Sequence, residues 1–291
     1  GTPDRDALLA LFREFEFKGW VEELLADAGS GTASSAAAAN DPAGTPRHYE
    51  TVLEWPAFET WLARLRTCDL FAFDTETTSL DYMQAELVGV SFAVEPGAAA
   101  YVPLAHDYLG VPPQLDRQRV LAALKPLLED SARPKVGQNL KYDMSVLARY
   151  GIELRGIAYD TMLESYVLDP TGSRHDMDTL ALKYLGETTI HFEDIAGKGA
   201  KQLTFNQIEL EQAGPYAAED ADVTLRLHHT LWPRLHAQPG PEAVFRDIEI
   251  PLVPVLSRIE RNGALVDGRL LAEQSLELGA SLIELERRAH D

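Results

Sequence analysis

Short apolar runs alternate with segments of helical periodicity along the central part of the chain. Five of the short runs predict strands, at residues 69–80, 86–94, 99–104, 134–137 and 156–159. Three segments predict helices, at residues 58–66, 117–128 and 140–150. Glu95-Pro96-Gly97 is a strong turn signal between the second and third strands, so we expect an antiparallel meander. The pattern therefore predicts an α/β fold in which helices flank a mixed β-sheet.

Helical patterns dominate the C-terminal part of the sequence. The predicted helices there lie at residues 179–185, 214–235, 249–261 and 269–290. Asn262-Gly263 supplies a left-handed cap at the end of the third. The last predicted helix carries a series of leucines, and the chain stops within it. We therefore expect this end to be the partial helical start of a further domain.

The N-terminal region has a different composition. Residues 6–26 repeat apolar side chains at helical spacing, whereas residues 28–46 are rich in Ala, Ser and Gly and contain no large apolar residue. A segment of the second kind cannot bury a core and is typical of a flexible linker. The expected organisation is a helical tail at 1–27, a linker at 28–47, a folded domain at 48–237 and a truncated domain at 238–291.

Composition narrows the class of protein. The chain has 291 residues, 45% of them hydrophobic, which is enough to bury a sizeable core. Its single cysteine, Cys68, excludes an internal disulfide and fits a reducing compartment. No apolar run is long enough to span a bilayer, and no signal peptide precedes the first helix, so we expect a soluble cytoplasmic protein without a membrane partner.

The net charge argues against nucleic acid as a partner. The formal charge is −20 with a sequence pI near 4.7, and such a surface repels polyanions. Any function on nucleic acid must therefore depend on local chemistry that overrides the charge of the whole molecule.

Two acidic residues end the first predicted strand. In the stretch FDTET, Asp74 and Glu76 are two residues apart, so a strand places both carboxylates on one face, roughly 6–7 Å apart along the chain. Two like charges in this arrangement cost free energy unless a positive group lies between them.

Two further acids lie on predicted helices. Asp143 follows the start of the helix at 140–150, beside its apolar face, and an alternative explanation is a solvated first-turn acid favoured by the helix dipole. Tyr216 and Asp220 are spaced i,i+4, so phenol and carboxylate share one helix face. An alternative for this pair is a surface tyrosine packed over an aspartate.

A different chemistry follows if Asp74, Glu76, Asp143 and Asp220 converge. Together they carry a formal charge of −4, which two divalent cations would balance, as in two-metal phosphoryl chemistry. Carboxylate oxygens suit Mg²⁺ or Mn²⁺, whereas one cysteine and no histidine pair at ligand spacing make a structural zinc site a poor fit. Spacing alone does not establish that the four acids meet.

Five motifs occur in an order that resembles a known family. They are FAFDTETTSLD, KVGQNLKYD, SRHDMDTLA, FEDIAGKGAKQLTFNQ and YAAEDADVTL, and they are similar to the proofreading 3′–5′ exonuclease domain of the bacterial DNA polymerase I family. LFREFEFKGW resembles the end of the upstream 5′-nuclease portion, and IEIPLVPVLSRIERNG resembles the entry into the polymerase portion with its thumb. The resemblance implies the ribonuclease-H-like fold of the DEDD exonucleases, in the tyrosine subgroup.

The resemblance also implies roles for individual residues. Asp74, Glu76, Asp143 and Asp220 match the metal-binding acids for two divalent cations, Mg²⁺ with Mn²⁺ or Zn²⁺ as substitutes. Tyr216 matches the tyrosine that helps position the attacking water. A phenol with an ordinary pKa of ~10 is a poor base at neutral pH, so we expect Tyr216 to orient the water by a hydrogen bond.

Substrate-binding positions are implied in the same way. Leu80 and Phe192 match apolar residues that pack on the terminal bases, a contact that tolerates any base sequence. The positions matching residues near sugar and phosphate are Thr77, Gln138, Asn139, Tyr142 and Arg174. Each has an ordinary structural alternative, such as a helix cap for Asn139 or a core position for Leu80.

The expected function is hydrolysis of phosphodiester bonds at the 3′ end of single-stranded or frayed DNA. The products would be nucleoside 5′-monophosphates, and the setting would be DNA replication and repair near the bacterial nucleoid. We expect a monomer that works beside the remainder of the polymerase chain in cis, and no polymerase activity from these residues alone. The alternatives are a scaffold module that orients the polymerase portion, which loss of an acid would have favoured, and an RNA-processing relative.

Two histidine-containing stretches are expected to be structural. His175 is followed by Asp176 and Asp178, and we expect these acids to cap the helix that follows rather than to bind a metal. His228 and His229 are predicted to face solvent on the helix that carries Tyr216.

Overall fold

The structure is a computed structural model that describes residues 47–290 except Ser173. The predicted helical tail at 1–27 and the predicted linker up to residue 46 lie outside the described residues.

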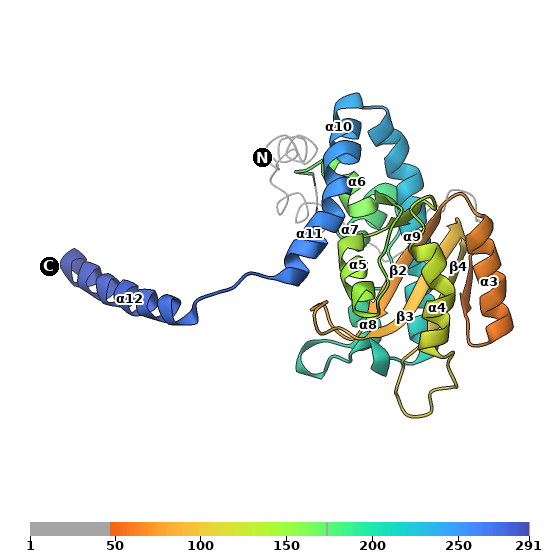
Figure 1. Ribbon diagram of the computed structural model, residues 1–291, viewed down its shortest axis with the longest axis horizontal. Coiled ribbons are helices and arrows are strands. Elements are labelled where there is room, and N and C mark those ends of the chain that lie inside the picture. The colour runs from red at the N-terminus through yellow and green to blue at the C-terminus, as the bar shows by residue number, and fades with distance from the viewer. Residues whose placement is uncertain (1–46, 173, 291) are drawn as a thin grey trace, which may run out of the picture. The chain divides into compact units, whose positions relative to one another are not determined.

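A six-stranded mixed sheet has the order β1-β4-β3-β2-β5-β6. The strands are β1 (His48–Thr51), β2 (Phe71–Thr77), β3 (Leu87–Glu95), β4 (Ala98–Pro103), β5 (Lys135–Gly137) and β6 (Ile157–Asp160). β2, β3 and β4 pair antiparallel, so the predicted meander is confirmed, and they run side by side in Figure 1. β5 pairs parallel with β2, β6 with β5, and β1 with β4.

Helices cover both faces of this sheet. One face packs against α3 (Trp55–Thr67), α4 (Arg117–Leu128) and α5 (Leu140–Arg149), and α9 (Leu210–His236) crosses the other. Alternation along β2 sends Phe71 and Phe73 into the first core and Ala72 into the second, beneath the alanines of α9. The predicted α/β class, a mixed sheet flanked by helices, is confirmed.

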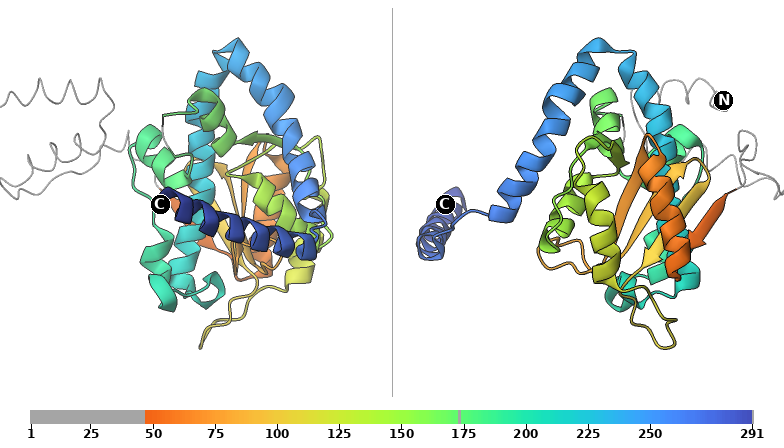
Figure 2. Two further views of the ribbon diagram at one scale, coloured as in Figure 1. Left: turned by 90° about the vertical axis from the view of Figure 1, so that its left-hand side faces the viewer. Right: turned by 45° about the vertical axis from the view of Figure 1, so that its right-hand side comes forward.

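Shorter elements complete the domain. They are α6 (Thr161–Leu168), α7 (Met177–Leu180), η1 (Ala181–Leu185), α8 (Phe192–Ala196), η2 (Gly199–Lys201), η3 (Phe205–Gln207), α10 (Pro239–Val244), η4 (Phe245–Glu249) and α11 (Ile250–Asn262). In Figures 1 and 2, α9 leads at its upper end into α10, and α11 then runs back down. The hydroxyl groups of Ser145 on α5 and Ser257 on α11 lie 3.0 Å apart, which fixes α11 against the domain.

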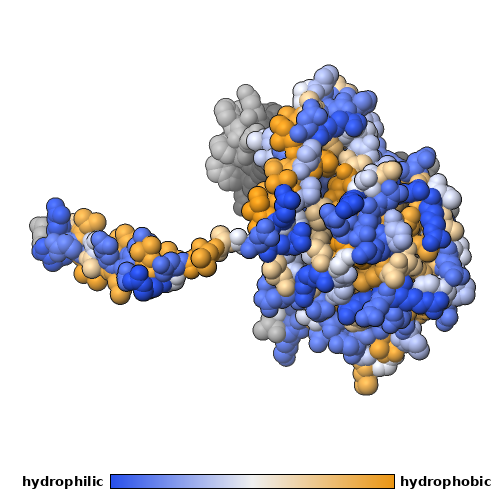
Figure 3. Space-filling view, viewed as in Figure 1, coloured by the Kyte–Doolittle hydropathy of each residue, from blue (hydrophilic) through white to orange (hydrophobic). Residues whose placement is uncertain are grey.

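The last predicted helix is present as α12 (Gly268–His290). It buries none of its residues, and its apolar side chains are among the exposed large hydrophobics. Figure 3 shows apolar and charged residues interspersed along it. None of the helices among residues 47–290 is long and apolar enough to cross a membrane.

The start of α5 differs from the expectation for Asn139. Asn139 occupies the N-cap position in a left-handed conformation (φ 60°), but its side chain makes no capping hydrogen bond. Asp160 supplies the cap instead, because its carboxylate accepts from the backbone amides of Asn139 (3.1 Å) and Leu140 (2.8 Å). The same carboxylate caps α6 through the amide of Met162 (3.0 Å), so one side chain begins two helices.

The prediction that His228 faces solvent is wrong. His228 is buried (5% exposed), and its Nδ1 lies 2.7 Å from Oε1 of Glu164 on α6. The reason is that α6 packs along α9 and covers a face that the sequence pattern assigned to solvent. His229 is exposed as expected. Asp176 caps α7 by accepting from the amide of Thr179 at 3.0 Å, as predicted. The same prediction is wrong for Asp178, which lies within α7 and accepts from the Thr189 hydroxyl at 2.6 Å instead.

Candidate active site

Three acidic side chains meet where the end of β2 faces α9. Asp74 and Glu76 come from β2 and Asp220 from α9, and each offers a carboxylate oxygen within 4.8 Å of the other two. Oε1 of Glu76 is buried and has no hydrogen-bond partner. Burying an acceptor without a partner costs free energy, and a cation bound beside this oxygen would supply the missing partner.

Asp143 reaches the same region from the opposite face of the sheet. It lies on α5, in the first turn of the helix. Its Oδ1 accepts from the backbone amide of Thr75 at 2.9 Å and from the Thr75 hydroxyl at 2.5 Å. Asp143 lies outside the group of three within 4.8 Å, yet its charge acts on Glu76. Residues 74, 75 and 76 therefore connect to helices on both faces.

The site is electrostatically crowded. Burial, and then the neighbouring charge of Asp220, raises the pKa of Asp74 to about 8. Burial and neighbouring carboxylates likewise raise the pKa of Glu76, Asp143 and Asp220 well above the ordinary range. A positive charge placed between these groups would reverse the effect and release their protons.

Tyr216 lies one helical turn before Asp220 on α9. Burial, followed by the charges of Asp220, Glu76 and Asp74, raises the pKa of Tyr216 far above that of a free phenol. The hydroxyl therefore stays protonated at neutral pH and is a hydrogen-bond donor, with the Asp220 carboxylate as its acceptor here. This strengthens the expectation that Tyr216 does not act as a base.

These groups line a cavity of about 620 Å³. Of the site residues expected from the sequence, all except Asp143 and Arg174 contribute to its wall. Those that do are Asp74, Glu76, Thr77, Leu80, Gln138, Asn139, Tyr142, Phe192, Tyr216 and Asp220. The volume falls within the ~300–1,000 Å³ that is usual for ligand sites.

A family model described as 3′–5′ exonuclease matches residues 49–236. The chain belongs to the 3′–5′ exonuclease family. It is 63% identical over 293 residues to DNA polymerase I of Pseudomonas aeruginosa, covering 100% of this chain and 32% of that protein. It is 47% identical over 255 residues to DNA polymerase I of Rhizobium leguminosarum, covering 82% and 25%. The expected resemblance to bacterial DNA polymerase I is confirmed, and the chain spans about a third or less of these relatives.

Solved structures share the fold of this exonuclease domain. The structure titled POL domain of Pol1 from M. smegmatis in complex with DNA primer-template and dNTP aligns with a TM-score of 0.63 at 21% identity, covering 80% of this chain and 36% of that one. Brucella melitensis NrnC aligns with a TM-score of 0.52 at 20% identity, covering 76% and 95%. At these identities the likeness shows the fold alone.

One wall of the exonuclease cavity is ordered by hydrogen bonds. The hydroxyl of Tyr142 donates to the carbonyl of Ser79 at 2.5 Å and also contacts the Thr77 hydroxyl. Burial raises the pKa of Tyr142 to about 12, so its hydroxyl remains a donor. Leu80 follows on the same loop with 93% of its side chain exposed, and it is therefore available to a ligand.

Arg174 is not brought to the cavity. Its side chain is 87% exposed and pairs with Asp176, with 3.1 Å between Nε and Oδ2. The segment around it is nonetheless connected to the cavity wall, because the amide of Gln138 donates to the carbonyl of His175 at 2.8 Å. The role of Arg174 in substrate binding remains a prediction.

Residues 202–205, in the segment before α9, also line the cavity and were not among the predicted site residues. Phe205 is buried (2% exposed), whereas Leu203 is 42% exposed. The quoted motif FEDIAGKGAKQLTFNQ contains these residues and was the available signal. Nothing in the spacing of that motif indicates which of its side chains turn toward the acids.

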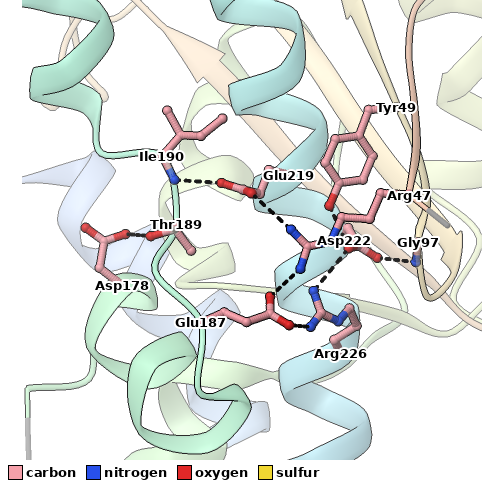
Figure 4. A network of polar contacts seen from close by, with 10 residues as sticks. All are labelled: Arg47, Tyr49, Gly97, Asp178, Glu187, Thr189, Ile190, Glu219, Asp222 and Arg226. Atoms are coloured by element: carbon pink, nitrogen blue, oxygen red, sulfur yellow. Dashed lines mark hydrogen bonds and ion pairs between the residues drawn. The ribbon is translucent and has the colours of Figure 1, made fainter. Parts of the chain in front are cut away.

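A polar network holds α9 in its orientation (Figure 4). Glu219, the neighbour of Asp220, accepts from the amide of Ile190 at 2.7 Å. Asp222 accepts from the amide of Gly97 at 2.6 Å, and its other oxygen accepts from the Tyr49 hydroxyl at 2.8 Å. Further members join through ion pairs: Arg47 with Glu187 and Glu219, and Arg226 with Glu187 and Asp222. These contacts fix the rotation that turns Asp220 toward the cavity.

Proposed function

We propose that this chain hydrolyses the phosphodiester bond at the 3′ end of single-stranded or frayed DNA and releases nucleoside 5′-monophosphates. The observation that carries the proposal is the meeting of Asp74, Glu76 and Asp220 in one cavity, with Asp143 beside them and Tyr216 in the wall. The family match and the relatives named DNA polymerase I support the direction of cleavage and the substrate.

The residues present fit two divalent cations. Asp74, Glu76, Asp143 and Asp220 would hold them, and the unpartnered Oε1 of Glu76 is an open ligand position. Carboxylate oxygens favour Mg²⁺, and Mn²⁺ or Zn²⁺ can replace it. A similar fold has been solved as Brucella melitensis NrnC with bound Mg²⁺, which supports the choice. When bound, the cations neutralise the developing negative charge and lower the pKa of water.

The remaining work falls to side chains of this chain. The protonated hydroxyl of Tyr216 donates a hydrogen bond that orients the attacking water. Leu80 and Phe192 contact the faces of the terminal bases, which allows any base to be removed. Thr77, Gln138, Asn139 and Tyr142 contact sugar and phosphate, and Arg174 supplies positive charge from outside the cavity.

The domain acts in DNA replication and repair next to the remainder of a polymerase chain, as a monomer. Because the net charge is −20, few phosphates are neutralised, and the chain on its own binds DNA weakly. We expect a shallow slope of log K against log salt concentration, and a steep slope would contradict this account.

The deciding experiment follows the shortening of a 5′-labelled single-stranded DNA, and separately identifies the released nucleotides, in Mg²⁺, in Mn²⁺ and in a chelator. We expect stepwise shortening from the 3′ end with either cation and none with the chelator. A matched RNA oligomer tests the RNA-processing alternative, and faster cleavage of RNA would favour it. A folded wild-type chain that releases no nucleotide with either cation would overturn the proposal.

A further inference from the structure

Phe205 is the centre of an aromatic cluster at the wall of the cavity. Its ring centroid lies 5.9 Å from that of Tyr216 and 6.5 Å from that of Phe192, with which it is stacked. On its other side, the ring centroid of His106 lies 5.6 Å away and that of Tyr101 6.1 Å away. Phe205 therefore connects two residues of the proposed site with a buried pair that does not line the cavity.

The ring of His106 is fixed at both nitrogens. Its Nε2 lies 2.7 Å from the hydroxyl of Tyr101, and its Nδ1 lies 3.0 Å from the carbonyl oxygen of Ile208. A carbonyl only accepts, so Nδ1 carries the proton and Nε2 accepts from the tyrosine. Burial lowers the pKa of His106 to about 4, so the neutral form that this pattern requires is the form present at neutral pH.

Further contacts hold both His106 and Tyr101 in place. The backbone amide of His106 donates to the side chain of Gln114 at 2.8 Å, and the Gln114 amide donates back to the His106 carbonyl at 2.8 Å. Tyr101 is fully buried and lies over Gly89, where an added Cβ would be 2.3 Å from the phenol oxygen. The pair is thus a rigid surface against which Phe205 rests.

We infer that His106, together with Tyr101, is a positioning residue of the exonuclease site, acting through Phe205 on the ring of Tyr216. The inference rests on the proposed role of Tyr216 as the group that orients water. Phe205 begins η3, and Ile208, the residue directly after η3, accepts the hydrogen bond from His106. Loss of that bond frees the segment that carries Phe205, and small displacements of an orienting group slow a reaction substantially.

The test is a double-mutant cycle on the rate constant. His106→Leu is expected to lower kcat about tenfold while KM for single-stranded DNA stays within about twofold. In the Tyr216→Phe background the same substitution should lower kcat by much less, because the hydroxyl through which it acts is already gone. An equal loss of kcat in both backgrounds, or no loss in either, would overturn the inference.

Two more conservative substitutions test whether a lower kcat of His106→Leu comes from a folding defect. Tyr101→Phe removes one oxygen and keeps the ring, and it should lower kcat in the same direction and show the same coupling to Tyr216→Phe. His106→Gln keeps an acceptor for Tyr101 and should recover part of the loss. The ring-proton nuclear Overhauser contact between Phe205 and Tyr216 should weaken in His106→Leu, and a contact of unchanged strength would count against the inference.

His228 is the matched control. It is also a buried histidine, with its ring nitrogen Nδ1 hydrogen-bonded to Glu164, but it lies outside the cavity wall. His228→Leu should lower the thermal midpoint and leave kcat of the folded fraction unchanged in both backgrounds. If the wild-type chain releases no nucleotides the proposed function fails, whereas an active wild type with additive substitutions removes only this inference.

Discussion

Thr75 holds one oxygen of Asp143 with both its backbone amide, at 2.9 Å, and its hydroxyl, at 2.5 Å. The two residues lie on different elements, β2 and α5, and the bond spans the boundary between the sheet and the helix layer. With Oδ1 engaged in this way, Oδ2 is the oxygen of Asp143 that Thr75 does not hold. Thr75 therefore orients a carboxylate that the proposal assigns to a cation.

Thr75→Val should reduce the rate without unfolding the chain. Valine keeps the shape and the backbone bond and removes only the hydroxyl. Hydrogen bonds to charged groups contribute about 1.5–3 kcal/mol, so we expect kcat/KM to fall about 10–100-fold. Asp143→Asn should cost more, about 10³-fold. Thr60→Val removes a threonine hydroxyl bond outside the cavity wall, to the carbonyl of Pro56 (3.0 Å), and should leave the rate unchanged. Full activity of Thr75→Val would show that the hydroxyl does not orient Asp143.

Leu80→Ala should weaken substrate binding and leave stability unchanged. The side chain is 93% exposed at the cavity, so its truncation removes little packing within the protein. We expect KM for single-stranded DNA to rise about five- to tenfold, equivalent to about 1 kcal/mol of lost contact with a base. Leu109→Ala is the comparison, because Leu109 is equally exposed but does not line the cavity. Equal KM values for both variants would exclude Leu80 as a base contact.

Asp160→Ala should destabilise the domain by removing the cap of two helices at once. The carboxylate accepts from the amides of Asn139 and Leu140 at α5 and of Met162 at α6. We expect a loss of about 2–3 kcal/mol in the free energy of unfolding, measured by urea denaturation. Asp116→Ala removes a single exposed cap, that of α4, and should cost about 1 kcal/mol. A loss for Asp160 no larger than for Asp116 would contradict the double cap.

His106 should contribute to acid denaturation. Burial lowers its folded-state pKa to about 4, below the ~6.5 of an exposed histidine. As the pH falls, the unfolded state takes up this proton first, so the stabilisation is complete above about pH 6.5 and is lost on the way to pH 4. The thermal midpoint of His106→Gln should therefore fall less steeply than that of the wild type between these values. Parallel curves would show that His106 is not the group responsible.

The sequence predicted most of the sheet because its signals were local. Glu95-Pro96-Gly97 marked the turn of the meander, and apolar runs marked the strands on either side. β1 was missed because it has four residues, none of them fully buried, and no alternation to distinguish it from a loop. Its pairing with β4 depends on a contact with a distant part of the chain.

For the candidate site, too, the sequence predicted some features and missed others. Resemblance identified Asp74, Glu76 and Asp220, and the geometry of β2 and α9 brings them together. Phe205 was missed because its importance comes from rings contributed by three other elements and a loop. His228 was misjudged because helical periodicity shows the face turned to the sheet, but not the second face that α6 covers.

The close packing of Asp74, Glu76 and Asp220 has opposite effects on the proposed reaction and on the stability of the fold. Without a cation, burial and mutual repulsion raise the pKa of these carboxyl groups, so the folded chain disfavours the charges that the proposed reaction requires. Neutralising one of them, as in Asp74→Asn, is therefore a change that strengthens the fold while it disables the site. A cation that binds only the folded chain supplies the missing stability, about 2.7 kcal/mol at a hundred times its Kd. Under the proposed function the acidic cluster is a trade-off between activity and stability, and a cation bound there would also stabilise the fold.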